Sequence, residues 1–303
     1  MTPHGSGIGV LGLSAARLAA LSLTCAALAA CTNTPSPLAP GFEGGVGVPH
    51  LGVQTGALEL PRRGPGFARY RPRSPHYWGQ PRLVGALQRA AARVHAEFPG
   101  GKPLLFGDLS GQHGGKIPHH NSHRTGRDVD ILWYVTTPSG APVLSPGFVN
   151  VGGDGLAQLG SDFIALDVPR VWALIKALLQ DPEASVQWMF CSQAIEALLI
   201  DYARSRGEAD ALVWYAETVL LQPRDSASHD DHIHMRFACS PAELARGCAG
   251  GGPYWEFLPG ELPPELSDEQ VIELALMEPA LEPALEHTDG DAEAASETAA
   301  ARP

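Results

Sequence analysis

Several features typical of other protein classes are missing or scarce in this chain. The apolar run over residues 18–30 is shorter than the about 20 residues that a membrane-spanning helix needs. Lysine and arginine number 21 against 33 acidic residues and form no basic stripe, which argues against a nucleic-acid partner. Neither His-Glu-x-x-His nor Gly-x-Ser-x-Gly occurs, so the sequence lacks both the helical zinc motif of many metalloproteases and the nucleophile elbow of serine hydrolases.

Cysteine is also scarce, with five residues, and their positions indicate export. The apolar run ends in Leu28-Ala29-Ala30-Cys31, and small residues before a cysteine are typical of the site cut by lipoprotein signal peptidase. We therefore predict that residues 1–30 are a signal peptide and that Cys31 becomes a lipidated first residue on a membrane surface. Cleavage by the ordinary signal peptidase is the alternative. Thr32 in place of aspartate favours, by analogy with Gram-negative sorting, a periplasmic protein anchored to the outer membrane.

Three cysteines remain in the predicted mature chain, namely Cys191, Cys239 and Cys248. An odd number leaves one thiol over in an exported protein. Cys239 and Cys248 bracket a short loop that contains proline and glycine, and a local disulfide there could brace it. Three reduced thiols are the alternative.

Charge and composition divide the rest of the chain. Residues 261–303 hold twelve carboxylates against one arginine and are rich in alanine and proline, so we predict an acidic disordered tail. Residues 31–65, with proline and glycine throughout, are predicted to form a flexible tether after the lipidated cysteine. The remaining segment, residues 66–260, is long enough for one domain with a substantial core.

Apolar spacing and capping residues predict the elements of this domain. In chain order they are a helix over residues 83–98, a helix capped by Asp167, a strand over residues 186–190, and helices over residues 192–206 and 208–221. Helices and strands without regular alternation indicate an α+β fold. We expect Trp172, Trp188 and Trp214 to lie in the core.

Histidine is concentrated in two short windows. Seven of the 12 histidines fall there, namely His113, His119, His120, His123, His229, His232 and His234. Such clustering favours a metal site over a solvated polar loop, which remains the alternative.

Strand geometry explains how these windows could bind a metal. If residues 232–234 are extended, His232 and His234 project to one side, because side chains alternate between faces. Zinc binds imidazole nitrogen and carboxylate oxygen, and a catalytic site uses three protein ligands. We therefore predict that His123, Asp130 and His234 bind one zinc ion, and that His232 performs acid–base chemistry. Manganese or iron could occupy the same ligands.

Two further residues share the predicted strand faces. Asp128 lies on the face of Asp130 and is either a support for the ligands or a solvated carboxylate. Arg236 lies on the face of His234 and could hold a carboxylate of a substrate.

The ordered combination of His-x(6)-Asp and His-x-His resembles the signature of the lysostaphin, D-alanyl-D-alanine carboxypeptidase and hedgehog-like metallopeptidases. Penicillin-insensitive murein endopeptidases are the closer resemblance, which covers about residues 70–250. The matching segments are Tyr77–Val84, Gly107-Asp108, Gly114-Gly115, His120–Ile131, His229, His232–Arg236 and Cys239.

The resemblance implies a zinc-dependent endopeptidase that cuts the D-alanyl–meso-diaminopimelyl cross-link of peptidoglycan. It also implies a single α+β domain whose central antiparallel sheet, flanked by helices, carries the zinc. The residues it assigns are His123, Asp130 and His234 as ligands, His232 as the catalytic histidine, and His120 and His229 as further active-site histidines. Two alternatives stay open: a zinc D,D-carboxypeptidase or other amidase on stem peptides, and a lipid-anchored protein that binds the wall without turnover.

Overall fold

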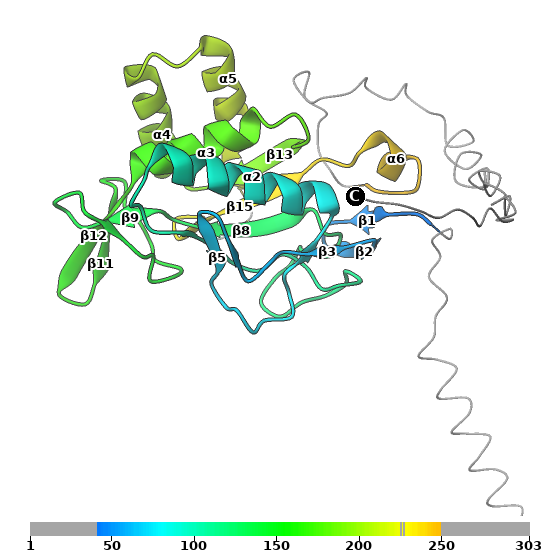
Figure 1. The fold of residues 1–303 in the computed structure, drawn as a ribbon. Helices are drawn as coiled ribbons and strands as arrows, with labels where there is room; N and C mark the ends of the chain where they lie inside the picture. Colours follow the sequence, from blue (N-terminus) through cyan, green and yellow to red (C-terminus); the bar gives the residue numbers. More distant parts are fainter. Residues whose placement is uncertain (1–40, 225, 227, 250–303) are drawn as a thin grey trace, which may run out of the picture.

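A seven-stranded sheet forms the centre of the computed structural model, which describes residues 41–224, 226 and 228–249 (Figure 1). Its strand order is β14-β13-β15-β8-β7-β5-β4. The strands are β4 (Arg63–Gly64), β5 (Phe67–Arg69), β7 (Leu104–Phe106), β8 (Asp128–Leu132), β13 (Val186–Phe190), β14 (Leu220–Leu221) and β15 (His232–Phe237). The predicted signal peptide, Cys31 and the acidic tail lie outside the described residues.

The sheet is mixed, which corrects the prediction of an antiparallel one. Strands β13, β15, β8 and β7 are antiparallel neighbours, but β14 pairs parallel to β13 and β5 pairs parallel to β7. Parallel neighbours need a crossover connection, and the helices supply it. Helices α4 and α5 lie between β13 and β14 in the chain, and α2 lies between β5 and β7. The prediction therefore holds for the four central strands and for the β4–β5 pair at one edge, but not for the whole sheet.

Five helices occur in the described part of the chain, and they belong with the sheet to one mixed α/β domain. They are α2 (Pro81–Glu97), α3 (Val168–Leu179), α4 (Gln193–Ser205), α5 (Asp210–Val219) and α6 (Pro241–Leu244). Figure 1 shows α2 and α3 lying across one side of the sheet, with α4 and α5 beyond α3. Buried side chains of α2 and α3 join those of β8, β13 and β15 in a single apolar core.

Most predicted helices are confirmed, and their caps explain why. The Asp167 side chain accepts a hydrogen bond from the backbone N–H of Arg170, and Ser192 caps α4 in the same way. The helix predicted over residues 208–221 is shorter, because its last two residues form β14. Trp172 is buried as expected, but Trp214 is 53% exposed, so the core prediction for Trp214 is wrong.

Three smaller sheets surround the central one. A four-stranded antiparallel sheet has the order β10-β9-β12-β11. Its strands are β9 (Val135–Thr136), β10 (Pro142–Val143), β11 (Leu156–Leu159) and β12 (Asp162–Leu166). Two antiparallel pairs complete the set: β1 (Gly44–Val48) with β2 (Leu51–Thr55), and β3 (Leu58–Glu59) with β6 (Trp78–Gly79).

The β1–β2 hairpin lies within the segment predicted to be a tether, so the folded part begins earlier than residue 66. The backbone N–H of Gln54 donates to the carbonyl of His113, and its side chain donates to the carbonyl of Gly111. On the other side, the backbone N–H of Gly45 donates to the buried carboxylate of Glu243. The glycines that suggested flexibility instead permit close packing, because a Cβ on Gly52 would overlap Thr125.

The disulfide between Cys239 and Cys248 is confirmed, with Cα atoms 6.1 Å apart. It joins the chain just after β15 to the segment that follows α6. Helix α6 itself carries Glu243. Cys191 is a buried free cysteine. Over the described residues, every helix is too short or too polar to cross a bilayer.

Candidate metal centre

The pairing of β8 with β15 places the predicted polar residues opposite one another. His234 faces Asp130, and Arg236 faces Asp128, across the two antiparallel strands. Since successive side chains of a strand alternate, His232, His234 and Arg236 share one face of the sheet. The residues between them, such as Ile233, are buried on the other face. The sheet thus supplies one rigid wall of the site.

The loop between β7 and β8 supplies the other histidines. His123 lies in the left-handed backbone region with φ of 65°, a conformation that is costly for residues other than glycine. The carbonyl of His123 accepts a hydrogen bond of 2.6 Å from the buried hydroxyl of Ser110, which in turn accepts one from the N–H of Gly126. At the start of the loop, a Cβ on Gly107 would lie 2.9 Å from that of Asp130. These contacts hold the loop against β8.

Three atoms form a nearly equilateral triangle at the centre of the site. His123 Nε2 lies 3.2 Å from Asp130 Oδ1, His234 Nδ1 lies 3.4 Å from the same oxygen, and the two nitrogens are 3.4 Å apart. A tetrahedral cation with ligands at about 2.0–2.1 Å requires ligand–ligand distances of about 3.3–3.4 Å. Among the described residues, no group donates a hydrogen bond to buried Asp130 Oδ1. Such an orphaned oxygen is costly unless a cation pairs with it.

A hydrogen bond at one ring nitrogen of each imidazole determines which ring nitrogen is left to bind a metal. His123 Nδ1 lies 2.5 Å from the carbonyl oxygen of Leu109, and His234 Nε2 lies 2.9 Å from Asp128 Oδ1. A carbonyl and a carboxylate can only accept, so these two nitrogens carry the hydrogens. His123 Nε2 and His234 Nδ1 therefore keep their lone pairs for a cation beside Asp130 Oδ1. Support of ligands by hydrogen bonds to the second ring nitrogen is typical of metal sites.

His232 and His229 lie beside this triangle. His232 Nε2 is 3.4 Å from Asp130 Oδ1, and its Nδ1 is 2.6 Å from Asp231 Oδ1. Burial lowers the pKa of His232, but the neighbouring carboxylates of Asp130 and Asp231 outweigh burial and raise the pKa to about 9. Burial, reinforced by the charges of His234 and His232, lowers the pKa of His229.

His120 lies between the carboxylates of Asp108 and Asp130. Its Nε2 lies 3.4 Å from Asp108 Oδ2, and its Nδ1 lies 3.7 Å from Asp130 Oδ2. The hydroxyl of Ser74 donates to the other oxygen of Asp108 at 3.0 Å. Burial raises the pKa of Asp108, but the hydrogen bonds from His120 and Ser74 lower it overall.

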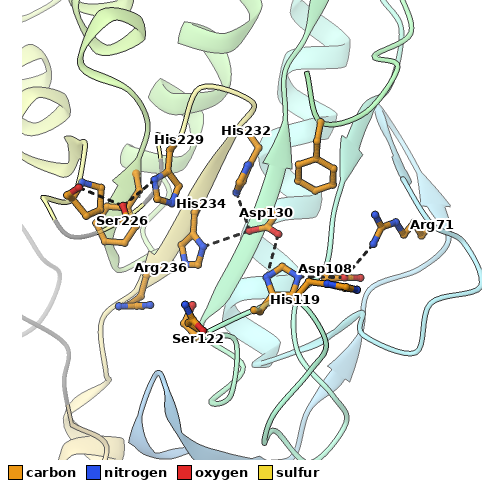
Figure 2. Close-up of a pocket in the computed structure, with 15 residues that line it drawn as sticks. Arg71, Asp108, His119, Ser122, Asp130, Ser226, His229, His232, His234 and Arg236 are labelled. Atoms are coloured by element: carbon orange, nitrogen blue, oxygen red, sulfur yellow. Dashed lines mark hydrogen bonds and ion pairs between the residues drawn. The ribbon is translucent and has the colours of Figure 1, made fainter. Parts of the chain in front are cut away.

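The six predicted site residues lie at or directly beside one cleft of about 550 Å³, and Figure 2 shows the residues that line it. Five of them line it, whereas His123 is fully buried behind them. The lining residues that sequence reasoning gave no role include Arg71, Asp108, Phe148 and Phe190.

The sequence model of the family described as penicillin-insensitive murein endopeptidase matches residues 45–253. The chain belongs to this family. The match begins inside β1, in agreement with a β1–β2 hairpin that is part of the domain.

Curated penicillin-insensitive murein endopeptidases are similar to the chain over two thirds of its length or more. The protein of Haemophilus influenzae is 31% identical over 218 residues, which are 70% of this chain and 68% of that protein. Those of Klebsiella pneumoniae and Escherichia coli O157:H7 are 31% and 30% identical over 209 residues, or 67% of this chain and 69% of each relative.

In this member of the murein endopeptidase family, two residues that sequence reasoning missed contact residues that it found. Asp108 belongs to a segment that matched the family, but only the fold reveals its contact with His120. Asp231 directly precedes His232, and the sequence gave no reason to single it out among 33 acidic residues.

Proposed function

We propose that the chain is a zinc-dependent murein endopeptidase that hydrolyses the D-alanyl–meso-diaminopimelyl cross-link of peptidoglycan. The observation that carries the proposal is the triangle of His123 Nε2, Asp130 Oδ1 and His234 Nδ1, whose sides of 3.2–3.4 Å fit the edges of a tetrahedral zinc site. Membership of a family of murein endopeptidases supports the substrate class.

In this proposal the two imidazoles and the carboxylate of the triangle hold one zinc ion. Zinc bound to three protein ligands can activate water near neutral pH and polarise the carbonyl of the bond to be cut. The backbone of Leu109 and the carboxylate of Asp128 keep both imidazoles in the tautomer that this binding needs.

His232 is the proposed general base and acid. It takes a proton from the attacking water at Nε2 and returns it to the amine that leaves, while Asp231 holds Nδ1. A cation bound to the carboxylate of Asp130 would offset part of the negative charge that stabilises protonated His232. The neutral imidazole that a general base requires would then be favoured. His229 and His120 line the two sides of the cleft and are proposed to hold the substrate and orient the reacting groups.

The proposed location is the periplasm. Residues 1–30 would be removed, Cys31 would carry the lipid that holds the enzyme to the outer membrane, and residues 261–303 would form an acidic tail. The catalytic domain would include the β1–β2 hairpin in addition to residues 66–260. Mass spectrometry of the mature N-terminus would decide between a lipidated Cys31 and an unmodified product.

The test of the activity is mass spectrometry of purified cross-linked muropeptides incubated with the enzyme, with chelator, and with chelator followed by zinc. Metal-dependent appearance of monomers with intact D-alanine ends is the expected result. Loss of only a terminal D-alanine would assign a carboxypeptidase instead. The absence of any product from a protein that holds stoichiometric zinc would leave a wall-binding protein without turnover.

A further inference from the structure

Arg236 is held in place by a carboxylate that also holds a predicted ligand. Its Nε donates a hydrogen bond of 2.7 Å to Asp128 Oδ1, and His234 Nε2 lies 2.9 Å from the same oxygen. Asp128 is fully buried and faces Arg236 directly across the two strands. One rigid carboxylate therefore fixes both the imidazole of His234 and the guanidinium of Arg236.

The outer edge of this guanidinium remains available to a ligand. Arg236 lines the cleft, and its side chain is 14% exposed (Figure 2). Over the described residues, the bond to Asp128 is the only hydrogen bond that its side chain makes, so Nη1 and Nη2 have no hydrogen-bond partner there, while the guanidinium lies 5.9 Å from the centre of the Phe190 ring. A guanidinium anchored through Nε presents a planar pair of donors that matches the two oxygens of a carboxylate.

We propose that Arg236 binds the substrate carboxylate that neighbours the scissile bond, on the residue whose amine is released. This inference rests on the proposed function, because the diaminopimelyl centre joined to D-alanine carries such a carboxyl group. Arg236 follows His234 by two residues on the same face, a spacing of about 6.6 Å along a strand. That spacing suits a substrate whose scissile carbonyl lies beside His234 and whose neighbouring carboxylate extends along β15. The site then selects bonds whose leaving residue bears a free carboxylate.

The test compares two purified muropeptide dimers that differ in one group. In one dimer the carboxyl next to the scissile bond is free, and in the other it is a carboxamide. For the full chain with zinc, kcat/KM on the free-carboxylate dimer should exceed that on the amidated dimer by about 10- to 100-fold, as charge-assisted hydrogen bonds require. In Arg236→Gln this ratio should fall to about 1–3, while Arg236→Lys should keep part of it, since lysine retains the charge without the planar pair.

Two other arginines provide controls, and bound zinc is measured for every variant. Arg89 binds both oxygens of Asp181 and does not line the cleft, so Arg89→Gln should leave the ratio unchanged. Arg71 also lines the cleft, and a ratio that collapsed in Arg71→Gln rather than Arg236→Gln would overturn the assignment. A purely structural role for Arg236 would lower both rates together and preserve the ratio, which would also overturn it.

The wild-type enzyme separates this inference from the proposed function. If it cleaves both dimers equally well, the role of Arg236 is refuted while the endopeptidase stands. If it cleaves neither dimer in the presence of bound zinc, the proposed function fails and the inference fails with it.

Discussion

At the scale of single residues, His123 and His234 each use one ring nitrogen for orientation and direct the other at Asp130. A ligand role for His234 could be proposed from the sequence, because the spacing of His-x-His and the alternation of a strand are local properties. His123 lies in a loop, and its proposed role came from the cluster of histidines that precedes Asp130. The supporting contacts could not be predicted in the same way. Leu109 acts through its backbone carbonyl, and the contact of Asp128 with His234 depends on the register of two strands that are about a hundred residues apart.

Replacement of His123 and of His232 should have different effects. His123→Ala removes a proposed ligand, so bound zinc measured by elemental mass spectrometry should fall well below one per chain. His232→Ala should keep the zinc and lose about 10²- to 10⁴-fold in kcat on cross-linked muropeptides, the usual contribution of a general base. Full activity of His232→Ala would remove this residue from the mechanism. Loss of zinc from His232→Ala would make it a ligand.

Asp128→Asn should weaken metal binding although Asp128 is not a proposed ligand. The amide keeps the shape but loses the charge that accepts from His234 Nε2 and pairs with Arg236. We expect zinc affinity to fall about 10- to 100-fold, as for other supports of metal-bound histidines. Competition with a fluorescent chelator measures this, and Asp231→Asn, which alters a contact of His232 instead, is the matched control. Equal affinities in both variants would contradict the prediction.

At the scale of elements, the β1–β2 hairpin shows where composition is a poor guide. Glycine and proline in residues 31–65 predicted a flexible tether, yet Gly45 and Gly52 let the hairpin pack against Thr125 in the loop that carries His123. Composition indicates how flexible a backbone can be, but it does not indicate which residues the folded backbone contacts. Trp214 is a second case, because it was expected in the core and is exposed on α5.

A pair of glycine substitutions tests this packing. A Cβ on Gly52 would overlap Thr125 and the carbonyl of Val46, so Gly52→Ala should lower the free energy of unfolding by about 1–3 kcal/mol. Gly85 lies in α2, and a Cβ there would meet only the flexible end of Arg89. Gly85→Ala should therefore raise the free energy of unfolding by about 0.5–1 kcal/mol through helix propensity. Urea unfolding measures both, and an unchanged free energy of unfolding in Gly52→Ala would show that the hairpin contact is unimportant.

At the scale of the whole molecule, the sheet combines two kinds of connection. The site lies on the four antiparallel strands β7, β8, β15 and β13. Helical crossovers add β14 parallel to β13 at one side and β5 parallel to β7 at the other. The main helices and strand β13 were predictable from periodicity and caps, whereas the hairpin and the four-stranded sheet were not. The order of the strands could not be predicted, because the sequence does not show at which edge of the sheet a strand is added after a crossover.

Metal binding should be visible in the stability of the entire domain. A cation that binds the native triangle and not the unfolded chain raises stability by about 2.7 kcal/mol at a concentration 100 times its Kd. We expect the Tm in calorimetry to rise with added zinc and to fall with chelator. In a His123→Ala, Asp130→Ala double variant the Tm should not respond to zinc. A zinc response that persisted in that variant would place the binding elsewhere.

The contact between Gly45 and Glu243 joins residues 198 positions apart. The N–H of Gly47 likewise donates to the carbonyl of Gly247, beside the disulfide. The hairpin that steadies the histidine loop is therefore synthesised first, but it gains its last neighbours only when the other end of the domain emerges. A nascent or truncated chain that stops before α6 contains every proposed zinc ligand. It still lacks the contacts that join the hairpin to α6 and the segment after it. The packing around the proposed site is thus completed late in synthesis, only after the chain has reached α6.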